Sequence, residues 1–433
     1  MTPQANFMVL AAIEPSRETE LRALLASMND APGRVNADNA LIPFSQFDTL
    51  HFARFVILDD KTLDDVRVYG VAARAYPLYL AFLGDIDGDL NVFLEELVNR
   101  AEKGLRSIFS CCTGFTSGTD LVQWMKNHGS PAIANYVNWR GRTVVRVREE
   151  AALRKALEEY LRSHAPTLTG IPTREIFSKL QQFFIAERSA GRLTLSDESP
   201  TPIGWWIKNA LHLIGVPLLF LLALPLLVVI APVFLFRLRC MEKTDAEMCW
   251  RVDQAYSDAL ALLEDRDVSN QFTALASRKP GFVRLWTLIG ILATVEYAAR
   301  HIVRRGRLGR IRTIHFARWV LLDGKKRGVF FSNYDGTVES YMDDFINKAG
   351  FGLNAIFSNA IGYPRTNWLV RDGCADEQKY KNFLRRHTLP TQVWYKAYPG
   401  LTAIDLERNR RIREGLESSW MSEQETREWV ALL

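Results

Sequence analysis

Residues 87–115 read DGDLNVFLEELVNRAEKGLRSIFSCCTGF, and residues 335–363 read DGTVESYMDDFINKAGFGLNAIFSNAIGY. The two stretches align without a gap and share residues from the opening Asp-Gly to the closing Gly114 and Gly362. Apolar residues recur at helical spacing in both, so each stretch is predicted to be a turn followed by a long helix. The chain is therefore expected to contain a duplicated unit.

The duplication extends over most of the chain. His51-Phe-Ala-Arg54 recurs as His315-Phe-Ala-Arg318, in apolar runs that are typical of buried strands. Each copy is expected to read strand, helix, strand, strand, helix, short helix, strand, with the closing strands around Tyr136 and Tyr395. This order predicts an α+β fold of two tandem ferredoxin-like repeats. Their apolar sheet faces are expected to pack on each other as one pseudo-symmetric α+β barrel.

The expected organisation divides the chain into six segments. They are repeat 1 (1–165), a helical linker (166–202), an apolar membrane segment (203–238), a second helical linker (239–267), repeat 2 (268–420) and a C-terminal tail (421–433).

Composition excludes some classes of function. The net charge of the 433 residues is only +5, and no zinc-finger or RNA-binding signature occurs, so nucleic acid is not expected as a partner. The five cysteines form no CxxC pair, which is typical of a reducing compartment. Phosphate-binding, zinc-protease and serine-hydrolase motifs do not occur either.

The segment between the copies is predicted to enter a membrane. No charged residue occurs between Lys208 and Arg237, a run longer than the ~20 residues that span a bilayer. Trp205 and Trp206 are placed as an interfacial aromatic belt, and Arg239 follows Arg237 at the far end.

The mode of insertion has two readings. If both copies share one barrel, they lie on the same side, and the segment is a re-entrant or monotopic hairpin kinked at Pro217, Pro225 and Pro232. The alternative is one tilted span, with each copy pairing with another chain. A second apolar run, 285–295, is too short to span and is expected to be the first helix of repeat 2.

An arginine cluster follows this second run and is expected to face anionic headgroups on the cytoplasmic side. Its members include Arg304, Arg305 and Arg307.

Asp87 is the first candidate for chemistry. It is the fourth residue of Gly84-Asp85-Ile86-Asp87-Gly88, which is expected to be a turn before a helix, where a carboxylate caps unpaired backbone N–H groups. This GxxDG pattern resembles that of the dye-decolourising peroxidases, which are built from two ferredoxin-like domains. The resemblance implies a haem cofactor, with Asp87 as the distal acid. The second copy lacks the first glycine, and the proximal histidine of that family has no counterpart here.

The repeated His51/Arg54 and His315/Arg318 pairs are the second candidate. Positions three apart on a strand face opposite ways, so one member of each pair is expected to point into the barrel. The expected roles are structural hydrogen bonds, or haem or metal binding by His51 and His315, with Arg54 or Arg318 stabilising developing charge.

Three other histidines have less specific roles. His128 and His387 are expected to cap the C-terminus of the short helix in each copy, with haem ligation as the alternative. His212 lies inside the apolar segment, where a polar group often marks function.

Several phrases (HFARW, SNYDG, GYPRTNW, PTQVWYKAYPGLT) resemble a group of uncharacterised bacterial membrane-associated proteins of this layout. That likeness implies no activity. Three hypotheses follow. The first is a membrane-surface protein that binds a lipid or other apolar ligand. The second is a peroxidase-like oxidoreductase that uses Asp87 and haem. The third is a non-catalytic membrane partner of another enzyme.

Overall fold

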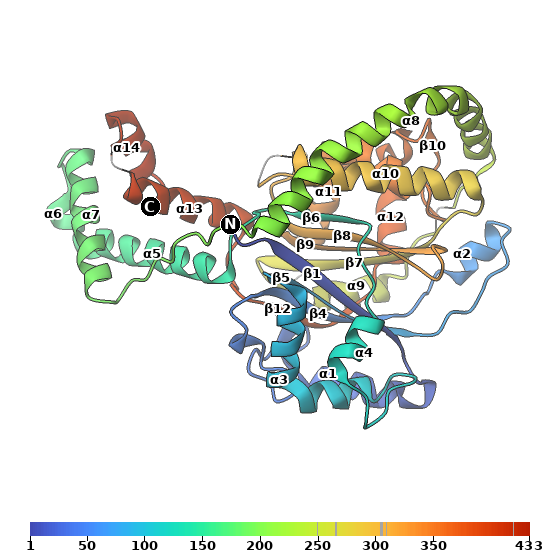
Figure 1. Ribbon diagram of the computed structural model, residues 1–433, viewed down its shortest axis with the longest axis horizontal. Helices are drawn as coiled ribbons and strands as arrows, with labels where there is room; N and C mark the ends of the chain where they lie inside the picture. Colours follow the sequence, from blue (N-terminus) through green and yellow to red (C-terminus); the bar gives the residue numbers. More distant parts are fainter. Residues whose placement is uncertain (249, 265, 304–305, 309, 419) are drawn as a thin grey trace.

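The computed structural model describes residues 1–433 except 249, 265, 304–305, 309 and 419. The fold is mixed α+β, with two four-stranded antiparallel sheets and one long apolar helix (Figure 1). The first sheet has the order β1-β5-β4-β12, and the second has the order β7-β9-β8-β6. The strands are β1 (Gln4–Ala12), β4 (Leu50–Leu58), β5 (Tyr79–Asp87), β6 (Ala134–Val137), β7 (Ser269–Ser277), β8 (Ile314–Leu322), β9 (Arg327–Asp335) and β12 (Thr391–Lys396).

The order of elements along the chain agrees with the expected repeat, but each closing strand pairs in the sheet of the other half. Strand β12 pairs with β4, placing Tyr395 opposite Ala53, and β6 pairs with β8, placing Tyr136 opposite Ala317. The chain before the apolar helix and the chain after it are therefore interlocked in both sheets.

The two sheets are stacked between two layers of helices. Side chains alternate along each strand, so Val56 and Leu83 of the first sheet pack against Val320 and Phe331 of the second. The opposite face of the first sheet packs against α1 (Glu18–Ser27), α3 (Leu90–Phe109) and α4 (Leu121–Asn127). The opposite face of the second sheet packs against α10 (Phe282–His301), α11 (Val338–Phe357) and α12 (Glu377–His387).

A group of helices extends away from the sheets on the left of Figure 1. It consists of α5 (Val144–Ser163), α6 (Ala165–Leu168), α7 (Thr173–Ser189), α13 (Ala403–Glu417) and α14 (Glu423–Val430). The corresponding helices of the two halves, α5 and α13, lie side by side, and Arg154 of α5 forms an ion pair with Asp405 of α13 at 2.8 Å. Leu153, Leu157 and Ile412 share the small apolar core of this group.

The long helix α8 (Ile203–Thr244) runs over α10 and bends at its far end (Figure 1). Both helices are long and apolar enough to cross a membrane, a criterion that buried core helices also meet. The most apolar window of α8 has a mean hydropathy of 3.0 and none of it is buried, whereas 28% of the α10 window is buried.

The shorter elements complete the fold. They are β2 (Asn29–Ala31), β3 (Arg34–Val35), α2 (Leu63–Val68), α9 (Gln254–Glu264), β10 (Thr366–Asn367), β11 (Arg371–Asp372) and the 3₁₀ turns Pro15–Arg17, Phe44–Gln46 and Gly373–Ala375.

Candidate functional site

Arg54 and Arg318 join the two sheets from opposite sides of their interface. Arg54 of β4 donates to one carbonyl of β7 and one of β9, at 3.1 and 2.9 Å. Arg318 of β8 donates in the same way to one carbonyl of β1 and one of β5, at 2.8 and 3.0 Å. Both arginines are buried and in equivalent places, so their contacts follow the duplication.

The two arginines differ in charge balance. Arg318 pairs with Asp85, whereas Arg54 meets Asn333 at the equivalent position, and Asn333 Nδ2 donates to Asp85 Oδ2 at 3.4 Å. Burial lowers the pKa of Arg54 to about 9; Asp85 opposes this shift and the nearby Arg318 adds to it. Among the described residues, Asp85 is thus the one carboxylate bonded to this pair of buried guanidinium groups, while the buried Glu264 also acts on Arg54 electrostatically.

His51 and His315 each bond an aspartate at the end of the neighbouring strand. The distance from His51 Nε2 to Asp87 Oδ1 is 3.0 Å, and that from His315 Nε2 to Asp335 Oδ1 is 2.7 Å. His51 Nδ1 also contacts the Tyr398 hydroxyl at 3.1 Å. The sequence predicted that His51 and Arg54 point to opposite faces of their strand. A register shift next to each histidine interrupts the alternation of side chains, so His51 and Arg54 both contact the other half of the chain.

The prediction that residues 84–88 form a turn is wrong for the first four. Strand β5 continues to Asp87, because β1 and β4 pair with it on both sides to its end, and the chain turns only at Gly88, where φ is 86°. A local Asp-Gly signal is overridden here by strand pairing.

Asp87 caps a helix, but not the one that follows it. Its Oδ2 accepts the backbone N–H of Val144 at 2.8 Å, at the start of α5, whereas Asp89 caps α3. In the second half, Asp335 Oδ2 accepts the N–H of Ala403 at 2.7 Å, at the start of α13. Equal use of both aspartates in the two halves indicates a structural role for each.

The space between the two sheets does not fit haem. The cavity between the sheets, next to Arg54, Asp85 and Arg318, has a volume of about 10 Å³, barely enough for one water molecule. Both ring nitrogens of His51 are already engaged. Within the described ranges, no group of three or more His, Cys, Asp or Glu side chains is arranged to hold a metal ion.

The expected capping role of His128 and His387 is confirmed. His128 Nδ1 lies 2.9 Å from the carbonyl oxygen of Trp124, and His387 Nδ1 lies 2.8 Å from that of Phe383. Each histidine thus satisfies a carbonyl in the last turn of its own short helix.

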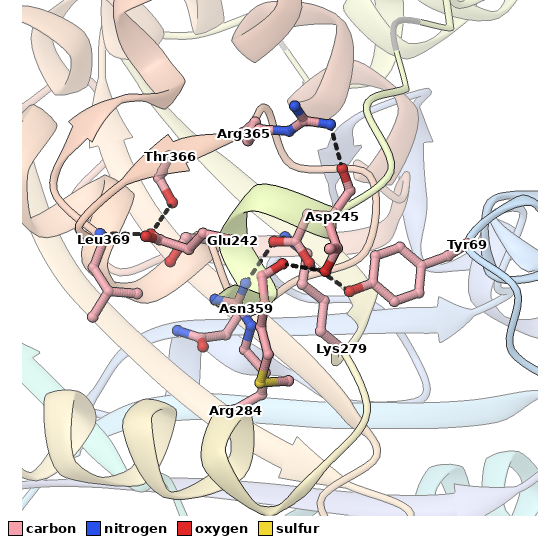
Figure 2. Close-up of polar contacts among 12 residues, drawn as sticks. Tyr69, Glu242, Asp245, Lys279, Arg284, Asn359, Arg365, Thr366 and Leu369 are labelled. Atoms are coloured by element: carbon pink, nitrogen blue, oxygen red, sulfur yellow. Dashed lines mark hydrogen bonds and ion pairs between the residues drawn. The ribbon is translucent and has the colours of Figure 1, made fainter. Parts of the chain in front are cut away.

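The C-terminal end of α8 is fixed by a buried ionic network, which we call the α8 anchor (Figure 2). Asp245 Oδ2 lies 2.6 Å from Lys279 Nζ and 2.5 Å from Arg284 Nη2, and its Oδ1 accepts the Tyr69 hydroxyl at 2.6 Å. Tyr69 follows α2 in the first half, and the two cations belong to the second. Burial lowers the pKa of Lys279 to about 8, against the opposing pull of Asp245.

Glu242 extends the α8 anchor one turn earlier. Its carboxylate accepts the Thr366 hydroxyl at 2.9 Å and the backbone N–H groups of Trp368 and Leu369 at 2.9 and 2.7 Å. Trp368 and Leu369 have left-handed backbones, with φ of 54° and 65°. Two successive N–H groups in such a loop form a concave anion site, so a carboxylate of α8 fills a nest in the second half.

The N-terminal end of α8 contacts the other end of α10. Arg300 Nε donates to Asn209 Oδ1 at 2.9 Å, and the Tyr297 hydroxyl donates to the Leu213 carbonyl at 3.0 Å. His212 Nδ1 lies 2.8 Å from His301 Nε2, which places the only histidine of the apolar segment against α10. Both ends of α8 are thus bonded to one folded body.

Five of the predicted membrane-surface residues lie toward the two ends of α8. Trp206, Lys208 and Arg237 are exposed, and Trp205 is half-buried. Arg239 pairs with Glu242 and stacks over Trp368. Arg307 is exposed, whereas Arg304 and Arg305 lie outside the described residues.

The largest cavity described here lies between α9, α11, α12 and β7, with a volume of about 790 Å³. Its wall includes the buried Glu264, whose carboxylate accepts Gln271 Nε2 at 2.8 Å and the N–H of Thr391 at 2.6 Å. Burial raises the pKa of Glu264 to about 7, although these hydrogen bonds oppose the shift. A separate cavity of about 480 Å³ lies beside Asp87 and is lined mainly by acidic and small residues.

The α8 anchor and Glu264 were not predicted from the sequence. Glu242 and Asp245 directly follow the apolar segment, which was the available signal. Comparisons of this chain with protein-family models, curated proteins and solved structures gave no match.

Proposed function

We propose that this chain is a monotopic membrane-surface protein that binds lipid along α8 and α10. The observation that carries the proposal is that α8, which is exposed and carries no charge between Lys208 and Arg237, contacts the same folded body at both ends. Leu222 of α8 is 71% exposed and Val229 is 73% exposed. A helix that is apolar on all sides is stable in lipid rather than in water.

The lengths of the two helices support an arch that dips into one leaflet. Between Leu213 and Asp245, α8 has a contour of about 48 Å, at ~1.5 Å per residue. The α10 residues that these two contact, Tyr297 and Arg284, are only about 20 Å apart on the same basis. The apolar stretch must therefore bow outward between its anchors, and the three prolines inside α8 favour bending.

The exchanged strands argue against a single crossing. A helix that crossed the bilayer would place residues before 203 and after 244 on opposite sides. Strand β12 pairs with β4, and β6 pairs with β8, so both sheets contain residues from each side of α8. We infer that the two halves are pseudo-symmetric repeats that form one barrel-like body on one membrane face.

The exposed Arg307, Arg310 and Arg312 follow α10, and such an excess of arginine favours the cytoplasmic face. The tightly filled space between the sheets makes the surface of α8 and α10 the better location for lipid than the interior of the barrel.

The topology is tested by cysteine labelling. Ser199→Cys and Lys243→Cys are made separately in a background in which Cys240 and Cys249 are replaced by serine. Both positions are exposed, and they lie on either side of the apolar run of α8. We expect an impermeant maleimide to label both from the cytoplasmic side of membrane vesicles, and the protein to stay in the membrane after alkaline extraction. Labelling of the two sites from opposite sides would refute the proposal.

Small-ligand binding in the 790 Å³ cavity is a second candidate function. Its volume lies within the ~300–1,000 Å³ range of ligand pockets, and it holds a carboxyl with a shifted pKa. Ala261→Trp would fill the cavity from α9. Mass spectrometry of the purified protein should find a small molecule in the wild type but not in this variant; no bound molecule in either would refute this candidate.

A further inference from the structure

A polar cavity of about 160 Å³ lies where the start of α8 meets the end of α10. Its walls include Asn135, Arg140, Trp205, Glu296 and Arg300. At ~30 Å³ for each water, its volume corresponds to about five water molecules. This is room for a phosphate group and the atoms next to it, but not for a whole lipid.

The charges around this cavity favour an anion. Both Nη nitrogens of Arg140 donate to carbonyls at the end of α10, those of Arg300 and Ala299, so this guanidinium is held at the cavity wall. Among the described residues, none is hydrogen-bonded to the Nη nitrogens of Arg300, whose Nε holds Asn209. Glu296 is the one carboxylate of the described wall, and its Oε2 accepts the N–H of Asn135 at 2.7 Å, so one negative charge faces two guanidinium groups.

The position of the cavity matches the depth of a lipid headgroup. Trp205 lies on its wall, and the uncharged run of α8 begins after Lys208. One turn further on, Leu211 and Ile214 are each 67% exposed, so acyl chains have an apolar surface beside the cavity.

We propose that this cavity binds the phosphate of an anionic phospholipid through the Nη nitrogens of Arg300, with the positive charge of Arg140 beside it. The guanidinium fork offers parallel N–H donors that match two phosphate oxygens. The proposal rests on the proposed function, because it requires the start of α8 to lie at a membrane surface. The arginine cluster after α10 does not contribute to this phosphate site.

The test measures lipid retained by the purified protein. Native mass spectrometry in detergent should find one phosphatidylglycerol on the wild type, and Arg300→Gln should lower its occupancy at least five-fold, as expected for one cation at a headgroup. Arg188→Gln removes the same charge from an exposed position on α7 and should leave the retention unchanged. Arg300→Lys should recover only part of it, since it keeps the charge but loses the fork.

Two further measurements separate the possible failures. Flotation with pure phosphatidylcholine vesicles tests α8 insertion alone and should be unaffected by Arg300→Gln. Equal phosphatidylglycerol retention by wild type and Arg300→Gln would overturn the headgroup site, while flotation by both would leave the proposed function standing. If inorganic phosphate, at the same concentration as the lipid, displaces the lipid from the protein, the site is one for free phosphate instead. If the wild type does not float with the vesicles, the proposed function itself is overturned.

Discussion

Moving the single acid of the cross-sheet cluster from one half to the other should leave the protein stable. Asp85 is 4% exposed and forms an ion pair with Arg318, the one such pair of either buried arginine among the described residues, whereas Asn333 occupies the equivalent position beside Arg54. Removing one partner of a buried ion pair costs about 3–5 kcal/mol. Asp85→Asn keeps the size of the side chain and one hydrogen-bond acceptor, so we expect the free energy of unfolding to fall by about 3 kcal/mol.

The reciprocal change restores the charge. In Asp85→Asn/Asn333→Asp, the new carboxylate pairs with Arg54, and the amide introduced at position 85 can donate to it, as Asn333 donates to Asp85 in the wild type. We expect the double variant to recover about 2 kcal/mol or more, a coupling typical of residues in one network. Thermal and denaturant unfolding in detergent, followed by circular dichroism, measures both effects.

The matched control is Asp48→Asn, at an exposed pair with Arg148. The side chain of Asp48 is 71% exposed, so this change should cost at most about 1 kcal/mol. If the double variant is as unstable as Asp85→Asn, the two arginines do not share their acid symmetrically, and the reasoning from the duplication fails.

Three other predictions test the remaining sites by the same unfolding measurements. The pKa of Glu264 is raised to about 7 in the folded state, whereas the same carboxyl releases its proton near pH 4.5 in the unfolded state. The free energy of unfolding of the wild type should therefore fall by about 3 kcal/mol between pH 4.5 and 7. Glu264→Gln should remove this fall, and an unchanged pH profile would contradict the assignment. Asp245→Ala leaves two buried cations without their partner and should lower the free energy of unfolding by about 3–5 kcal/mol. Its control, Lys243→Ala, changes an exposed side chain and should have almost no effect. Equal effects of the two substitutions would rule out the α8 anchor. Asp87→Asn and Asp335→Asn should destabilise the protein to a similar extent, by about 1–2 kcal/mol for a weakened cap, and a loss confined to Asp87 would revive a special role for that residue.

Local periodicity was enough to place most of the elements. The helices of the two quoted stretches occupy Leu90–Phe109 and Val338–Phe357, and the His-Phe-Ala-Arg runs lie in β4 and β8. The capping histidines were also predictable, because each bonds a carbonyl only four residues away.

Long-range pairing was not predictable in the same way. A closing strand of a given composition fits the edge of either sheet, and nothing near Tyr395 indicates that β12 pairs with β4 rather than with its own half. The ends of β5 and β9 were misjudged for the same reason, since Asp-Gly signals a turn locally but flanking strands extend the ladder to the aspartate.

The quoted stretch shows both sides of this division. Sequence alone established that Asp87-Gly88 and Asp335-Gly336 are equivalent and that a long helix follows each, because repeat identity and helical spacing are local properties. Only the tertiary structure decided that each aspartate caps α5 or α13, that Arg54 and Arg318 share one acid, and that α8 returns to the body it left. These features depend on contacts between residues far apart in the chain, which packing selects from many arrangements that the sequence pattern allows equally.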